Sequence, residues 1–209
     1  MTTPVAPPTG RSVPEPAVHL ITAEEAPLLL RPLYASGDPG PIAAALAQVP
    51  ELCQATLPFI DAALGPSWVP ARLKEIAILR TSALLGCRYC VETHTVVAHD
   101  TGFDLDQLAG LRSERPAEPT LTDPVERAVL RWVDQVAAST GPLDAAAARA
   151  LAQHLPDHAI VELTATVGAT MFLNRFATVL GLPTSAETIE RLVALGLRRW
   201  QPEPASAEA

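Results

Sequence analysis

The sequence predicts an all-α protein, and three observations lead to that prediction. Alanine and leucine are abundant while runs of β-branched residues are scarce, which favours helices over strands. Apolar residues recur at intervals of three and four, and no segment alternates apolar and polar residues as a half-buried strand does. Proline and glycine divide the long segments at positions typical of helix ends. The 209 residues suffice for one domain of ordinary size with tails.

The expected helices follow one another from residue 38 onward. Residues 38–64 hold two helices, and Pro50 lies in the first turn of the second, where a missing amide hydrogen costs nothing. Cys53 falls in that second helix at helical spacing from Leu57 and Ile60, so it is predicted to be a buried core thiol. The remaining helices are expected over residues 69–85, 87–102, 105–112, 122–139, 143–155, 156–182 and 185–197.

Several of these helices carry signals at their ends. Gly86 and Gly102 are expected to end two of them, because glycine adopts a positive φ without strain. The helix over residues 122–139 opens with Thr122 or Asp123 as its cap. One face of this helix is apolar, formed by Val125, Val129, Trp132, Val133 and Val136.

The two ends of the chain differ from its centre in composition. Residues 1–17 contain five prolines and few apolar anchors, which predicts a disordered or extended arm. Residues 201–209 are polar and predict a flexible tail. We therefore expect a single all-helical domain over residues 18–200.

Charge and cysteine content exclude several classes of function. A net charge of −8 argues against nucleic acid or an anionic membrane surface as a partner. No run of 18 apolar residues could span a membrane, and the first residues lack the pattern of a signal peptide. The odd number of cysteines does not suit a disulfide-stapled secreted scaffold. We expect a cytoplasmic protein whose thiols stay reduced unless a catalytic cycle oxidises them.

Cys87, Cys90 and His94 form the chemically informative group of the sequence. On a helix these positions lie at i, i+3 and i+7 and share one face. Gly86 directly precedes them, so the cysteines are expected in the first helical turn, where unpaired amide groups and the helix dipole favour a thiolate. His94 lies one turn beyond Cys90 and can accept its proton or stabilise its anion.

Three uses of this group remain open from the residues alone: a redox dithiol, a zinc site and ordinary helix packing. We favour the redox dithiol, because zinc normally takes four protein ligands in a structural site. The other cysteine and histidine residues are not at the spacing of a second ligand pair; they are Cys53, His19, His99, His154 and His158.

The run LKEIAILRTSALLGCRYCVETHTVVAHDTG, residues 73–102, extends the pattern. Glu75 stands twelve residues before Cys87, and Gly102 follows eight residues after His94. With this spacing the chain resembles the alkylhydroperoxidase D-like branch of the carboxymuconolactone decarboxylase family. A second block, MFLNRFATVLGLP, matches the family farther along the chain, and the resemblance covers about residues 40–185.

The resemblance implies a multi-helix bundle with the CxxC pair at the start of a core helix, and a homo-oligomer that is a dimer, trimer or hexamer. It implies an antioxidant peroxidase that needs no cofactor or metal, with a small hydroperoxide as substrate and an external thiol or lipoyl-type reductant as partner. It further implies that Cys90 is the peroxide-reacting thiol, that Cys87 resolves the intermediate, and that Glu75 and His94 relay protons. Lactone decarboxylation and a non-enzymatic zinc or redox-sensing scaffold are the alternatives.

Overall fold

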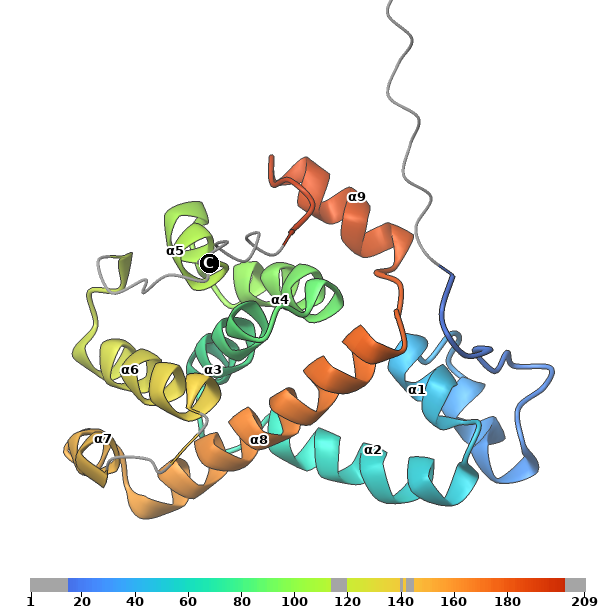
Figure 1. Cartoon of the computed structure of the whole chain (residues 1–209), viewed down its shortest axis with the longest axis horizontal. Helices are drawn as coiled ribbons and strands as arrows, with labels where there is room; N and C mark the ends of the chain where they lie inside the picture. Colours follow the sequence, from blue (N-terminus) through green and yellow to red (C-terminus); the bar gives the residue numbers. More distant parts are fainter. Residues whose placement is uncertain (1–14, 114–119, 140, 142–144, 202–209) are drawn as a thin grey trace, which may run out of the picture.

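The computed structural model describes residues 15–113, 120–139, 141 and 145–201, and within these ranges every regular element is a helix (Figure 1). The prediction of an all-α protein is therefore confirmed. The elements are the 3-10 helix η1 (Leu28–Tyr34) and the α-helices α1 (Pro41–Leu46), α2 (Pro50–Leu64), α3 (Ala71–Leu84), α4 (Arg88–Asp100), α5 (Leu105–Leu111), α6 (Pro124–Ala138), α7 (Ala145–Leu151), α8 (Asp157–Val179) and α9 (Ala186–Ala194). None of the described helices combines the length and apolar character that a membrane span requires.

Helix α3 forms the centre of the bundle. It packs against α4, α6 and α8, while α2 lies along α8 and α9 lies against α4 (Figure 1). Eleven of its fourteen residues are buried, so it contacts neighbours on nearly every side. An all-round buried helix of this kind needs partners for its polar residues as well as its apolar ones.

The polar residues of α3 find those partners on other helices. The Lys74 ammonium, only 2% exposed, pairs with Glu162 of α8 at 2.6 Å and also donates to the carbonyls of Ala63 and Gly65. Arg80, 1% exposed, pairs with Asp134 of α6 at 2.5 Å. These contacts join α3 to the helices on either side of it.

Most of the expected helix ends agree with the structure. Pro50 begins α2, and Gly86 and Gly102 follow α3 and α4 with φ of 68° and 95°. Asp123, rather than Thr122, caps α6, since its carboxylate accepts hydrogen bonds from two amide groups of the first turn. Cys53 is fully buried, as predicted, and burial raises its pKa.

Helix η1 was not among the predicted elements. Proline precedes it at position 27 and lies inside it at position 32, and the sequence shows no α-helical periodicity there. A short 3-10 turn tolerates these prolines, because it needs few consecutive amide donors. Tertiary packing of Leu30 and Tyr34 into the core holds it in place.

The expected arm and tail fall mostly outside the described residues, which begin at residue 15 and end at residue 201. Residues 15–17 run beside the end of α8, where the Ala17 amide donates to the Leu180 carbonyl at 2.9 Å. The division of the chain into arm, domain and tail stays a prediction.

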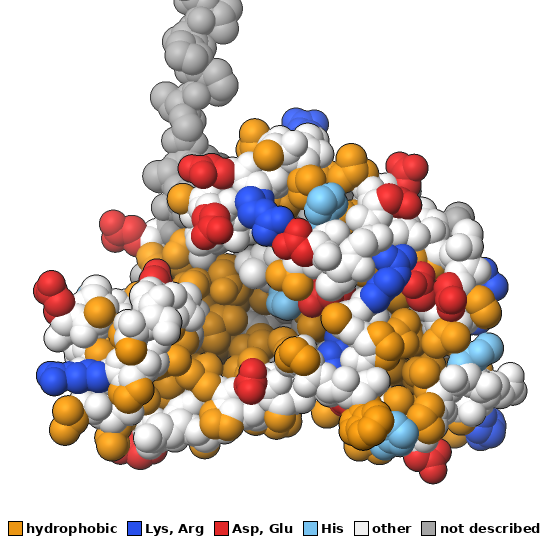
Figure 2. Space-filling view, turned by 180° about the vertical axis from the view of Figure 1, so that it is seen from behind, with side chains coloured by type: hydrophobic (Ala, Val, Ile, Leu, Met, Phe, Trp, Pro, Cys, Tyr) orange, Lys and Arg blue, Asp and Glu red, His pale blue; other side chains and the backbone are white. Residues whose placement is uncertain are grey.

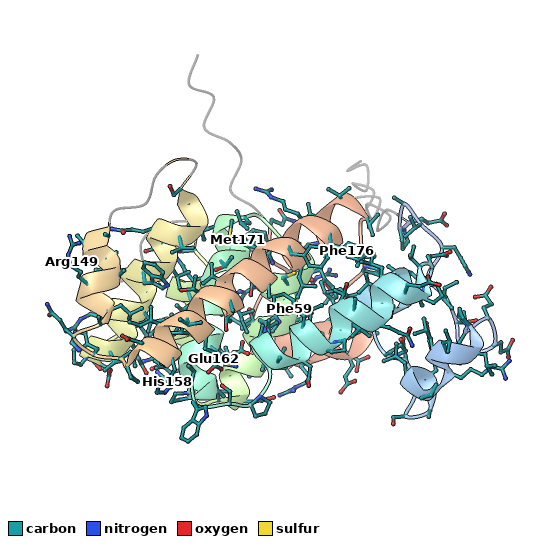
Figure 3. The ribbon with its side chains drawn as sticks, turned by 90° about the horizontal axis from the view of Figure 1, so that it is seen from below. Phe59, Arg149, His158, Glu162, Met171 and Phe176 are labelled. Carbon is teal, nitrogen blue, oxygen red and sulfur yellow. The ribbon has the colours of Figure 1, made fainter. Side chains whose placement is uncertain are left out.

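The faces of α2 and α8 are seen together in Figure 3, which looks at the molecule from below. The two helices run side by side, with Phe59 on α2 and Glu162, Met171 and Phe176 along α8 (Figure 3). Met171 packs against the largest core cluster, whereas Phe176 packs against the smaller cluster around Cys87 and Cys90. Helix α8 thus connects the main core to the dithiol.

Candidate dithiol site

Cys87 and Cys90 lie at the start of α4, as the sequence predicts. A tight turn at Gly86 returns the chain from α3, and the Cys87 amide donates to the Ser82 carbonyl at 3.0 Å. Cys87 is the cap of α4: its Sγ accepts the Cys90 amide at 3.4 Å. The two Sγ atoms are 2.7 Å apart, both cysteines are buried, and both are free thiols. A disulfide could form here with little movement of the backbone.

The two thiols differ in acidity. A hydrogen bond from the Cys90 thiol is the largest of the effects that lower the pKa of Cys87 to about 7. The Cys90 amide, Thr178 and the charge of His94 also lower it, whereas burial raises it. Donating that hydrogen bond, together with burial, raises the pKa of Cys90. Of the two thiols, Cys87 is therefore the one that ionises first, whereas the family resemblance implies Cys90 as the activated thiol.

His94 and Glu75 are brought together by the packing of α4 on α3. The His94 Nδ1 atom lies 3.1 Å from Oε2 and 3.4 Å from Oε1 of the Glu75 carboxylate, which is 8% exposed. The carboxylate holds the hydrogen on Nδ1, which leaves Nε2 as the basic nitrogen.

The alternative partners of Glu75 suggested by sequence proximity are engaged elsewhere. Arg72 pairs with Glu126 at 2.5 Å, and Lys74 pairs with Glu162. Glu75 is thus directed toward His94 rather than toward a neighbour on its own helix.

Two separate cavities open onto the dithiol. One, which we name the Cys90 cavity, has a volume of about 60 Å³ and is lined by Cys90, His94 and Asn174 among others. The other, the Cys87 pocket, has a volume of about 250 Å³ and is lined by Cys87, Thr178 and Trp200 among others. The two sulfur atoms therefore face different openings.

Tyr89 lines both cavities and lies between them. Burial and the nearby Cys90 and Cys87 raise the pKa of its hydroxyl to about 12, so this side chain stays neutral. The dithiol is otherwise surrounded by apolar side chains, including Ala45, Ala177 and Leu182. Figure 2, seen from behind, shows a hollow in the surface whose visible interior is largely hydrophobic (Figure 2).

Three residues of the site were not assigned a role from the sequence. Asn174 lines the Cys90 cavity and donates to the Ser82 hydroxyl at 3.0 Å, and its buried Oδ1 atom has no hydrogen-bond partner among the described residues. Asn174 is a polar residue in the most apolar helix of the sequence, and that contrast could have indicated a role for it in the site. Thr178 and Trp200 gave no such signal, because only the fold brings them beside Cys87. Among the described residues, no group of three or more Cys, His, Asp or Glu side chains is arranged to hold a metal ion.

Comparisons with known proteins agree with this picture. Residues 50–135, which include the Glu75–CxxC–His94 pattern, match the model of the carboxymuconolactone decarboxylase family. The sequence matches no curated protein significantly.

Solved structures show the same fold. An uncharacterized peroxidase-related protein with an alkylhydroperoxidase AhpD core, from Ralstonia eutropha JMP134, is 19% identical, with a TM-score of 0.73 over 84% of this chain and 95% of that one. The debrominase Bmp8 in complex with 2,3,4-tribromopyrrole is 19% identical, with a TM-score of 0.70 and the same shares of both chains. A protein of unknown function from Agrobacterium tumefaciens, described as a candidate antioxidant defence protein AhpD, is 27% identical, with a TM-score of 0.60 over 68% of this chain and 96% of that one. The predicted alkylhydroperoxidase D-like fold is thereby confirmed.

Proposed function

We propose that this protein, whose residues 50–135 match the model of the carboxymuconolactone decarboxylase family, is a thiol-dependent hydroperoxide reductase. One observation carries the proposal: two free sulfur atoms lie 2.7 Å apart beside a histidine that is paired with a buried carboxylate. Such an arrangement supplies a nucleophile, a resolving thiol and a proton relay within one small site.

In the first step a small hydroperoxide enters the Cys90 cavity. The Cys90 thiol passes its proton to the basic Nε2 atom of His94, which lines the same cavity. The Cys90 thiolate attacks the terminal peroxide oxygen, so that an S–O bond forms and the O–O bond breaks. The departing alkoxide takes a proton from the protonated His94 ring, which lines the same cavity, and leaves as an alcohol.

In the second step Cys87 attacks the sulfenic acid on Cys90. The S–S bond forms, the S–O bond breaks, and the hydroxide leaves with a proton as water. The short distance between the sulfurs favours this reaction over further oxidation of the sulfenic acid. Two external thiols then return the disulfide to the dithiol by exchange.

The first test is a titration of free thiols before and after one equivalent of cumene hydroperoxide at neutral pH. We expect the wild-type protein to lose Cys87 and Cys90 as free thiols, to recover both with dithiothreitol, and to retain Cys53. Cys90→Ser should abolish peroxide consumption. Cys87→Ser should allow one turnover and leave a sulfenic acid that dimedone traps.

Cys53→Ser is the matched control, because this buried thiol lies outside both cavities and should leave peroxide consumption unchanged. Unchanged thiols after peroxide, or equal activity of the wild type and Cys90→Ser, would contradict the proposal. In that case a spectrophotometric assay with carboxymuconolactone as substrate would test the decarboxylase alternative. A metal analysis of protein purified without chelator would test the zinc scaffold.

A further inference from the structure

The chain beyond α9 returns to the dithiol. Residues 198–201, which we name the C-terminal strap, turn back from α9 across α4 and α5 (Figure 1). Trp200 and Gln201 of this strap line the Cys87 pocket. Trp200 is only 7% exposed, belongs to the largest core cluster and is the largest residue of the lining.

A buried carboxylate anchors the strap to α4. Glu92, which has no exposed surface, lies two residues after Cys90. Its Oε1 atom accepts from Arg199 Nε at 2.6 Å and from the Trp200 amide at 3.1 Å. Its Oε2 atom accepts from Arg199 at 3.0 Å and from the Thr184 hydroxyl at 2.5 Å. A buried charge with this many donors holds its partners in one arrangement.

A second set of contacts orients the indole ring. The Trp200 Nε1 atom donates to the Arg112 carbonyl at 2.9 Å, and the Arg112 guanidinium donates to the Arg198 carbonyl at 3.1 Å. The backbone of Trp200 is thus held from α4, and its ring is held from the end of α5. The peroxide chemistry proposed above uses none of these contacts.

The strap borders only one of the two openings to the dithiol. The Cys87 pocket is lined by Trp200 and by the backbone of Gly86 and Gly181, whereas no residue of the strap lines the Cys90 cavity. Glycines add no side chain to the lining, and Trp200 is the largest of the residues that border this pocket, beside Arg88, Tyr89 and Leu182.

We propose that Trp200 is a specificity-determining residue that selects slender thiols as reductants of the Cys87–Cys90 disulfide, and that Glu92 is the residue that positions it. The inference rests on the proposed function, because it concerns the step that restores the dithiol. A thiolate that enters the Cys87 pocket attacks Cys87 Sγ, forms a mixed disulfide and releases Cys90 as a thiolate, which takes up a proton. A second thiol attacks the reductant's sulfur, releases it as a disulfide and frees Cys87.

The test measures reduction alone. The dithiol is oxidised with diamide, the oxidant is removed, and the disulfide is reduced with either dithiothreitol or reduced thioredoxin, whose dithiol sits on a protein surface. In Trp200→Ala we expect the rate with thioredoxin to rise about tenfold and the rate with dithiothreitol to change by less than about twofold. Glu92→Gln should change the ratio of the two rates in the same direction by a smaller factor, since it weakens the hold on Arg199.

Trp68→Ala is the matched control, because this tryptophan is 87% exposed and lines neither opening to the dithiol. A general loosening of the fold would raise both rates together and leave their ratio unchanged. An unchanged ratio in Trp200→Ala overturns the inference. If that variant does not fold, Trp200→Phe, which removes part of the ring and the bond to Arg112, takes its place under the same criterion.

The two proposals fail separately. Diamide, rather than a hydroperoxide, makes the disulfide in this experiment, so the ratio of reduction rates does not depend on peroxide turnover. Absence of peroxide turnover with a raised ratio in Trp200→Ala would count against the proposed function alone. Peroxide turnover with an unchanged ratio would count against the selection by Trp200 alone.

Discussion

The state of each sulfur at the dithiol depends on which group donates a hydrogen bond to it. Cys87 accepts the Cys90 amide, its contact with the Cys90 thiol lowers its pKa, and it lies where the dipole of α4 favours negative charge. The same contact raises the pKa of Cys90, which is enclosed by apolar neighbours. His94 contributes to the lowered pKa of Cys87 only as a more distant charge. The more acidic thiol of the pair thus lies at the helix cap, about two turns away from the histidine.

The acidity of Cys87 can be read from its rate of alkylation by iodoacetamide at different pH. The thiolate reacts and the thiol does not, so the rate should rise with pH about a midpoint near the pKa of about 7. Cys90→Ala removes the hydrogen bond that lowers this pKa most, so the midpoint should move upward, toward the ordinary thiol value of 9.0. Peptide mass spectrometry separates Cys87 from Cys53. A wild-type midpoint above 8.5, or one unmoved by Cys90→Ala, would contradict this assignment.

The pairing of Glu75 with His94 can be tested by Glu75→Gln. Glutamine retains the size of the side chain but removes the charge that holds the hydrogen on His94 Nδ1, so we expect peroxide turnover to fall by about 100-fold. His94→Ala should cost about as much, and the double variant little more, because the two residues act as one unit. Steady-state peroxide consumption measures all three. Fully multiplicative losses would show that the two residues act independently.

Among the elements, α3 has the greatest influence on both fold and site. It is buried on nearly all sides, yet it carries Lys74, Glu75 and Arg80. Each of these side chains reaches a different neighbour: α8, α4 and α6. The ion pairs to α8 and α6 accompany the apolar packing of α3, and the packing of α4 on α3 brings His94 to Glu75.

The pair between α3 and α8 gives a prediction about stability. Glu162→Ala leaves the buried Lys74 ammonium with carbonyl partners but without its counter-charge. We expect the free energy of unfolding in urea to fall by about 3 kcal/mol, since a buried charge that loses its partner is costly. Glu190→Ala, at an exposed position on α9, is the control and should change it by less than about 0.5 kcal/mol. Equal stability of the two variants would show that the carbonyls alone satisfy Lys74.

At the scale of the whole molecule, the strap joins the end of the described chain to its centre. Arg199 and Glu92 are 107 residues apart in sequence and pair at 2.6 Å. Arg199→Ala would leave the Glu92 carboxylate buried without its guanidinium, and we expect the free energy of unfolding to fall by about 3 kcal/mol. The double variant Glu92→Gln with Arg199→Ala should recover part of that loss in the same urea titration. No recovery would mean that the strap contributes through packing of Trp200 rather than through the buried charge.

Apolar side chains on the surface of the molecule are consistent with a homo-oligomer, and the homo-oligomer stays a prediction. Val49 at the start of α2, Leu52 and Phe59 on α2, and Phe172 on α8 are large apolar side chains between 42% and 52% exposed, and Figure 3 shows the two helices side by side. We expect sedimentation to give a multiple of the chain mass of 22.1 kDa, as in a dimer or larger oligomer. Phe59→Glu should reduce the assembled fraction, whereas Gln54→Glu on the same helix should not. Sedimentation of the wild type at the mass of a single chain would contradict the predicted oligomer.

The sequence by itself determined the helical class, nearly every helix and the position of the dithiol. These features depend on local information: the 3.6-residue periodicity, proline at the start of α2, glycine after α3 and the spacing from Cys87 to His94. Helix η1 was missed for the same reason, because its prolines interrupt the local periodicity from which a helix is predicted.

Only the tertiary structure decided which residues contact one another at the site. That Lys74 meets Glu162 rather than Glu75, that Cys87 is more acidic than Cys90, and that Trp200 borders the Cys87 pocket are all results of packing between elements. Residues distant in sequence come together only when the buried faces of α3, α4 and α8 are satisfied at once. Hydrogen bonds and buried charges act over a few ångströms, so their partners are chosen by that arrangement and not by spacing along the chain.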